Sequence, residues 1–210
     1  DVDIMYGEPV VVFLNGSFLG IMNLRVDSNG DALTSLFEKP EDDISLIEVY
    51  QSGIILPKKD HFDLNDAYMA AIENEDLDFV KEHTDISNII DYFIFETIVA
   101  NFDWPHNNVR LYAFEEEKYR FLLYDLDLCN TTHLNNDPMT FIDSYHENNM
   151  TDLFWLLYSD NEFQAQYDER FEEVVSLSGL SPERFEDLVH ENSARIEPLM
   201  EYQIQRHGQP

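Results

Sequence analysis

The sequence has few cysteines, few positive charges and no long apolar run. A single cysteine, Cys129, in 210 residues excludes an internal disulfide and a metal site built from thiolates alone. Seven glycines and eight prolines exclude a collagen-like or low-complexity chain. No apolar stretch approaches the length of about 18 residues that a membrane span requires, so we expect no membrane span.

Positive charge is outnumbered by negative charge throughout the chain. There are 12 Lys and Arg residues against 43 Asp and Glu, which gives a formal net charge of −31. Such a chain repels a phosphate backbone, so we expect no nucleic-acid partner. Free nucleotides would also be repelled unless metal ions accompanied them. Hydrophobic residues still make up 44% of the chain, which is enough to bury a core and excludes a disordered composition.

The apolar pattern predicts a single α+β domain over residues 1–210. The stretches 10–14 and 17–24 are typical of two strands joined by Asn15-Gly16, a pair that tolerates the positive φ of a tight hairpin turn. Residues 48–65 carry glycine, proline and charge at irregular spacing, and we interpret them as a loop. Two more strands are expected over 109–114 and 119–126.

Helices are predicted where apolar residues recur at intervals of three and four. The clearest begins at Thr84-Asp85, a plausible cap, and ends near Ala100, before a loop in which Pro105 disfavours helix at Trp104. The other expected helices cover 66–73, 76–82, 151–158, 160–176, 182–190 and 191–205.

Four polar residues in and after the loop that follows residue 100 form the candidate site. Asp103 is followed five residues later by Asn108, and Asp125 and Asp127 come at the end of the second strand of a hairpin. Their oxygens are hard ligands that suit Mg²⁺ or Mn²⁺. Protein kinases use the same Asp-x-x-x-x-Asn spacing, followed by a metal-binding Asp after a short hairpin. Alternatively, these residues only fill turns and a solvated strand end.

The residues around this site resemble those of the spore coat protein H (CotH) kinase family. The similarity is strongest over Asn101-Phe102-Asp103-Trp104-Pro105-His106-Asn107-Asn108 and Leu123-Tyr124-Asp125-Leu126-Asp127, which match its N-x-D-W…N-N loop and D-x-D strand end. The hairpin from Phe13 to Arg25 is similar to another segment of that family. The residues Asn161-Glu162-Phe163, Arg170 and Arg206-His207-Gly208 are similar to its helical tail.

This resemblance implies an atypical protein-kinase-like fold with an N-terminal β-hairpin region and a mostly helical C-terminal part. Because the chain has almost nothing before the hairpin, we expect an incomplete N-terminal lobe and a domain truncated at its N-terminus. The implied activity is transfer of phosphate from ATP to Ser or Thr of a protein substrate, with Mg²⁺ or Mn²⁺ as cofactor. The implied setting is bacterial: secreted, on the cell surface or in the spore coat.

The resemblance also implies roles for individual residues. Asp103 would be the catalytic acid of the loop, and Asn108 and Asp125 would bind metal, with Asp127 as a third metal-ligand candidate. Asn107 would support the loop and Trp104 would anchor it in the core. Arg25 is the nearest candidate for a phosphate-binding cation, with Lys58 and Lys59 behind it, and each of the three is also explained as a surface charge.

Two other functions are compatible with the sequence. A catalytically inactive kinase-like surface or coat protein would keep the fold for protein binding, and the short N-terminal region and Val26, where that family often has an acid, favour it. A domain that only binds divalent cations would show metal affinity without any effect of nucleotide.

Overall fold

The computed structural model describes residues 2–50, 54–58, 62–101, 103–115, 117–129, 142, 149–176 and 181–208. Within these residues the chain is α+β, as predicted. It divides into two compact units, which are described separately. The larger comprises Asp1–Met5 and Asp27–Phe171, and the smaller comprises Tyr6–Val26 and Glu172–Pro210. The prediction of one domain over 1–210 stays a prediction.

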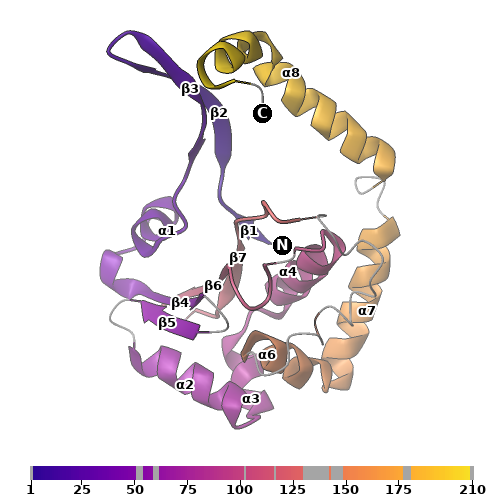
Figure 1. Cartoon of the computed structure of the whole chain (residues 1–210). Coiled ribbons are helices and arrows are strands. Elements are labelled where there is room, and N and C mark those ends of the chain that lie inside the picture. The colour runs from indigo at the N-terminus through magenta and orange to yellow at the C-terminus, as the bar shows by residue number, and fades with distance from the viewer. Residues whose placement is uncertain are drawn as a thin grey trace. The chain divides into compact units, whose positions relative to one another are not determined.

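The larger unit is built on a mixed sheet. In the described part of the chain this sheet has five strands in the order β1-β7-β6-β4-β5, with β1 parallel to β7 and the other neighbours antiparallel (Figure 1). The strands are β1 (Asp3–Ile4), β4 (Ile44–Tyr50), β5 (Ile54–Lys58), β6 (Val109–Phe114) and β7 (Arg120–Leu123). The predicted strands over 109–114 and 119–126 are therefore confirmed, although the second ends earlier.

The prediction of a loop over 48–65 is wrong. Strand β4 lies between β5 and β6, and every residue from Ile44 to Val49 is buried. A strand covered on both faces shows no alternation of apolar and polar residues, so its sequence lacks the period that would reveal it. Glu48 is among these buried residues. The loop prediction rested on glycine, proline and charge after residue 50, yet Pro57 and Lys58 lie in strand β5.

Helices cover both faces of the sheet. Those of the larger unit are α1 (Gly30–Leu36), the 3₁₀ turn η1 (Glu41–Asp43), α2 (Phe62–Glu73), α3 (Leu77–His83), α4 (Ile86–Ile98), α6 (Asn149–Tyr158) and most of α7 (Asn161–Ser176). On one face, Leu33 of α1 packs in a cluster with Leu46, Tyr112 and Leu122. On the opposite face, Phe121 contacts Tyr92 and Phe93 of α4.

Helix α4 positions the candidate site. Asp85 caps its N-terminus by accepting a hydrogen bond from the Asn88 N–H at 3.1 Å. Ile89, Ile90, Phe93 and Ile94 are buried, which confirms the centre of the predicted apolar face, whereas Ile86 and Ile98 at its ends are half-buried. The side chain of Asn88 bonds to the backbone of Phe121 in both directions, so the helix is fixed against β7.

The smaller unit consists of a β-hairpin and a long helix. Strands β2 (Gly7–Leu14) and β3 (Ser17–Arg25) pair antiparallel, and both residues of the turn, Asn15 and Gly16, have positive φ, so the predicted hairpin is confirmed. Helix α8 (Pro182–His207) contacts β3 through the side-chain oxygen of Gln203, which accepts from the Ile21 N–H at 3.0 Å (Figure 1).

Most of the predicted helices are confirmed, with two corrections. Helix α2 begins at Phe62, four residues before the predicted start. The segments 182–190 and 191–205 form one helix, because no glycine or proline stands where they meet. None of the described helices is long and apolar enough to cross a membrane.

Candidate functional site

The candidate site begins where α4 ends. The N–H of Ala100 bonds to the carbonyl of Thr97, and the N–H of Asn101 bonds to the carbonyl of Glu96. This pair of bonds is a Schellman motif, which requires a left-handed residue after the helix. Ala100 takes that conformation, with φ of 49°, although glycine usually fills the position. The chain therefore leaves the helix with its direction set by two backbone bonds.

The same two residues, Glu96 and Asn101, are also joined through their side chains. The Asn101 amide donates to Oε2 of Glu96 at 2.9 Å, and both side chains are fully buried. The Asn101 oxygen accepts from the Asp103 N–H at 3.4 Å, as in an Asx-turn, and its carbonyl accepts from the Trp104 N–H at 3.3 Å. The start of the loop is thus tied to a buried carboxyl of α4.

Asp103 is the residue on which the loop side chains converge. Its Oδ2 accepts from the Asn107 amide at 3.0 Å and from the Asn108 amide at 3.2 Å. Its Oδ1 lies 3.9 Å from Nε2 of His106. The side chain of Asp103 is 29% exposed, so the carboxylate is held in place and remains accessible to a ligand.

The loop is anchored by Trp104 and partly covered by His106. Trp104 is fully buried and packs edge-on against Tyr92 and Phe93, with ring centroids 6.3 and 5.2 Å away. Burial lowers the pKa of His106, and the charge of Asp103 only partly opposes this effect. The imidazole is therefore mostly neutral at neutral pH. A neutral imidazole leaves the negative charge of Asp103 uncompensated.

Asp125 lies two residues after the end of β7, before the turn at 127–129. Its φ of 57° is left-handed, as is that of Asn108, and aspartate and asparagine tolerate this conformation better than most residues. Asp125 is half-buried, whereas Asp127 is exposed. The two acids of the D-x-D pair therefore differ in environment, and Asp125 is the more enclosed.

Arg110 links the loop to the segment that carries Asp125. It follows Asn108 by two residues on β6, and its guanidinium lies over the ring of Tyr124, 4.6 Å from the centroid. It also forms an ion pair with Glu48 of β4 at 2.9 Å and bonds to the hydroxyl of Ser28. The backbone segments that carry Asn108 and Asp125 are thus held together by a stacked, paired cation.

Burial shapes the acid–base chemistry around these segments. It raises the pKa of Glu96 to about 8, although the hydrogen bond from Asn101 opposes the shift. It also raises the pKa of the Cys129 thiol to about 11, with the charges of Glu96 and Asp127 adding to the effect. A thiol with so high a pKa is a poor nucleophile and a poor metal ligand at neutral pH.

The other predicted site residues are placed as follows. Arg25 is exposed at the end of β3 and belongs to the smaller unit, whereas the Asp103 loop belongs to the larger unit. Lys58 ends β5, and Lys59 lies outside the described residues. Among the described residues, no group of three or more His, Cys, Asp or Glu side chains is arranged to hold a metal ion.

Sequence reasoning missed Glu96, Asn101 and Arg110 as parts of the site. Glu96 had a detectable signal, because it stands seven residues after Ile89 and therefore interrupts the apolar face of α4 with an ionisable group. Asn101 belongs to the motif, but its role depends on its contacts. For Arg110, no pattern in the sequence indicates that it meets Glu48, 62 residues away.

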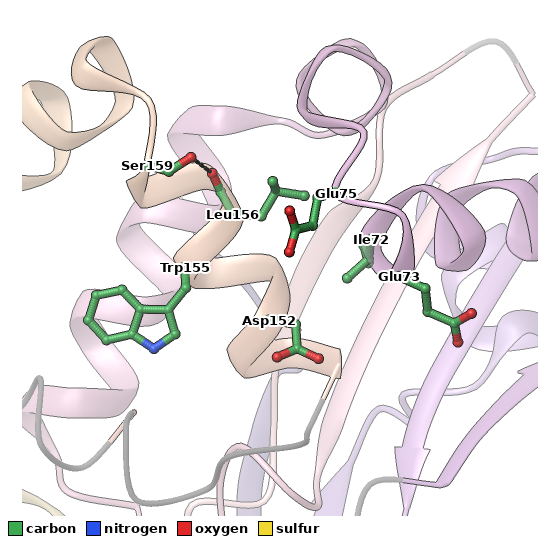
Figure 2. Close-up of a pocket in the computed structure, with 7 residues that line it drawn as sticks. All are labelled: Ile72, Glu73, Glu75, Asp152, Trp155, Leu156 and Ser159. Atoms are coloured by element: carbon green, nitrogen blue, oxygen red, sulfur yellow. Dashed lines mark hydrogen bonds between the residues drawn. The ribbon is translucent and has the colours of Figure 1, made fainter.

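The described residues of the larger unit line at least two hollows. One, of about 560 Å³, is mostly apolar and includes Phe95, Leu123 and Asp125 in its lining. The other, of about 440 Å³, lies between α2 and α6 and is lined by none of the predicted site residues (Figure 2). Three of its seven lining residues, Glu73, Glu75 and Asp152, are acidic.

A family model described as CotH kinase protein matches residues 3–210, which is nearly the whole chain. No curated protein matches the chain significantly.

Proposed function

Because this chain belongs to the CotH kinase family, we propose that it transfers the γ-phosphoryl group of ATP to a Ser or Thr hydroxyl of a protein substrate. The hydroxyl oxygen would form the new bond to phosphorus as the bond to ADP breaks. The observation that carries this proposal is the convergence of the Asn107 and Asn108 amides on Asp103 within a chain of this family.

Asp103 is the group proposed to orient the substrate hydroxyl and accept its proton. Both amides contact Oδ2, and this fixes the plane of the carboxylate and leaves Oδ1 for the hydroxyl. A base must lie within hydrogen-bonding reach of the proton that it takes, and partial exposure of Asp103 permits such an approach. The buried Trp104 would keep the loop rigid while substrate binds.

Asn108 and Asp125 are the residues proposed to hold Mg²⁺ or Mn²⁺, with Asp127 as a further candidate. Their oxygens have the chemistry that these ions require, and the Asn108 amide nitrogen is already bonded to Asp103. When bound, the ion would neutralise charge on the phosphates. Mg²⁺ commonly takes one or two carboxylates together with substrate phosphates, which agrees with the absence of a larger acidic cluster from the described residues.

The proposal includes a fold and a setting. We propose that the α+β chain has a protein-kinase-like fold, in which the hairpin belongs to the N-terminal lobe. We also propose a role on the bacterial cell surface, in the spore coat or in a secreted form, and membership of the CotH kinase family is what supports it.

Calorimetric titration with ATP, with and without Mg²⁺ or Mn²⁺, tests the proposal. We expect binding that depends on the metal and is lost in Asp125→Ala, and transfer of labelled phosphate to casein that is lost in Asp103→Ala. Asp78→Ala removes an exposed carboxylate of α3 and is the control, which should match the wild type. Asp127→Ala reports whether the second acid of the pair contributes.

The outcome also separates the alternative functions. Full activity in Asp103→Ala would contradict the catalytic assignment. Absence of nucleotide binding with either metal would favour a non-catalytic protein that uses this fold for protein binding. Metal binding that ATP leaves unchanged would favour a domain that only binds cations.

A further inference from the structure

We propose that Glu96 is a positioning residue whose buried carboxyl holds Asn101 and, through it, fixes the backbone of the Asp103 loop. The consequence for catalysis rests on the proposed function, whereas the effect on the loop does not. The contact through which Glu96 would act on the loop is its bond with Asn101.

Burying the Glu96 carboxyl costs free energy. Glu96 is fully buried beside Tyr92, and a buried carboxyl without compensating bonds is strongly unfavourable. The helix end itself does not need it, because a Schellman motif usually brings an apolar contact between the corresponding two positions. Here a carboxyl and an amide occupy them instead. The structure therefore uses a costly polar pair where an apolar pair would end the helix.

Two successive hydrogen bonds connect Glu96 to the loop through Asn101. The Glu96 Oε2 to Asn101 Nδ2 distance is 2.9 Å, and the Asn101 Oδ1 to Asp103 N distance is 3.4 Å. If Glu96 is removed, the buried amide of Asn101 loses its acceptor, and a buried unsatisfied donor favours any rearrangement that exposes it to water. Asn101 would then move, and Asn101 also holds the turn at Asp103 and Trp104.

A neutral side chain at position 96 can also accept the hydrogen bond from Asn101. Because the pKa of Glu96 is raised to about 8, the carboxyl is mostly protonated at neutral pH. The bond to Asn101 therefore requires only an acceptor oxygen, which glutamine also provides. Among the described residues, the groups that face Glu96 are Asn101, Tyr92, Tyr124 and Cys129, and none of these four is a cation.

Amide hydrogen exchange, measured by NMR on the whole chain, tests the effect on the loop. In Glu96→Leu, we expect the Asp103 and Trp104 amides to exchange about tenfold faster or more, with the amides of β6 and β7 unchanged. Glu96→Gln should resemble the wild type. Asn101→Ala breaks the same connection from the other end and should accelerate the same two amides, so the test remains available if Glu96→Leu does not fold.

Asn88→Ala is the matched control. Asn88 is equally buried on the same helix, but its side chain bonds to the backbone of β7 rather than to the loop. We expect this variant to lower global stability and to leave the loop amides no faster than the rest of the unit. Equal acceleration throughout the unit in Glu96→Leu or Asn101→Ala, or none at Asp103 and Trp104, would overturn the proposal.

Phosphate transfer gives a second measurement. Glu96→Leu should lower kcat about tenfold or more while KM for ATP stays the same, and Glu96→Gln should restore kcat. If the wild type transfers no phosphate, the proposed function fails, and the exchange result still decides whether Glu96 positions the loop. A raised KM with unchanged kcat would contradict a positioning role.

Discussion

Two carboxyl groups seven residues apart occupy opposite environments. Asp103 is partly exposed and receives two amide donors, whereas Glu96 is fully buried and receives one from Asn101. Burial favours the neutral form of an acid, so the two groups are suited to different tasks. Asp103 is available to a ligand, and Glu96 serves the structure that holds Asp103.

The raised pKa of Glu96 makes stability depend on pH. Between its ordinary value of 4.5 and about 8, the folded state retains a proton that the unfolded state has lost. The contribution of Glu96 to the free energy of unfolding therefore falls as pH rises, by up to about 1.4 kcal/mol per pH unit, and levels off above the folded pKa.

Glu96→Gln removes this titration while keeping the acceptor. We expect the variant to gain stability relative to the wild type as the pH is raised from about 5 to about 8. Urea unfolding of both proteins at each pH measures the difference, in which the titration of all other groups cancels. A difference that does not change with pH would show that Glu96 is already ionised in the folded state.

At the scale of elements, the end of α4 accepts a strained residue. Ala100 adopts a left-handed conformation, which is unfavourable for a residue with a Cβ atom. The turn that requires this conformation directs the chain into the Asp103 loop. The helix is held at its other end by the Asp85 cap and along its length by Asn88. These contacts hold α4 in place and so help to keep Ala100 in its unfavourable conformation.

Ala100→Gly should stabilise the protein by about 1 kcal/mol, because glycine adopts positive φ without steric cost. The same substitution at Ala67, an exposed position inside α2, should destabilise it by about 0.5–1 kcal/mol. Thermal or urea unfolding of the two variants measures these opposite effects. Destabilisation by Ala100→Gly would mean that the methyl group contributes more to packing than the left-handed conformation costs.

At the scale of the whole molecule, the dominant feature is the excess of negative charge. With 12 cations against 43 acids, one-to-one pairing would leave most carboxylates without a positive partner. Several of the cations are used in ion pairs that join separate elements, among them Arg120 with Asp3 and Asp85, and Arg170 with Asp91. The remaining acids repel one another, and this repulsion destabilises a folded state.

Salt should therefore stabilise the protein. Raising NaCl from about 0.05 M to about 1 M shortens the screening length from above 10 Å to about 3 Å, so repulsion between exposed acids weakens. We expect Tm to rise by about 2–4 °C for each kcal/mol of repulsion that is screened. A calorimetric scan at each salt concentration measures the shift. A fall in Tm would mean that the cross-element ion pairs outweigh the repulsion.

The sequence alone predicted the elements whose periods are regular. The hairpin followed from Asn15-Gly16 and its flanking apolar runs, and α4 followed from its cap and its apolar face. The family was also recognisable, because each of its two motifs, the loop at 101–108 and the acids at 125 and 127, is a short stretch of sequence. Strand β4 was not predicted, because burial on both faces erased its alternation.

Neighbouring residues are enough to specify the local turns, the helix caps, the acidic charge and the motif centred on Asp103. Which distant residues meet depends on the three-dimensional fold. Arg110 joins Glu48 and Tyr124, and the environment that raises the pKa of Glu96 is assembled from α4, the loop and the turn after β7. Local order follows from short-range sterics and hydrogen bonds, whereas burial and charge pairing depend on segments that are far apart in the chain.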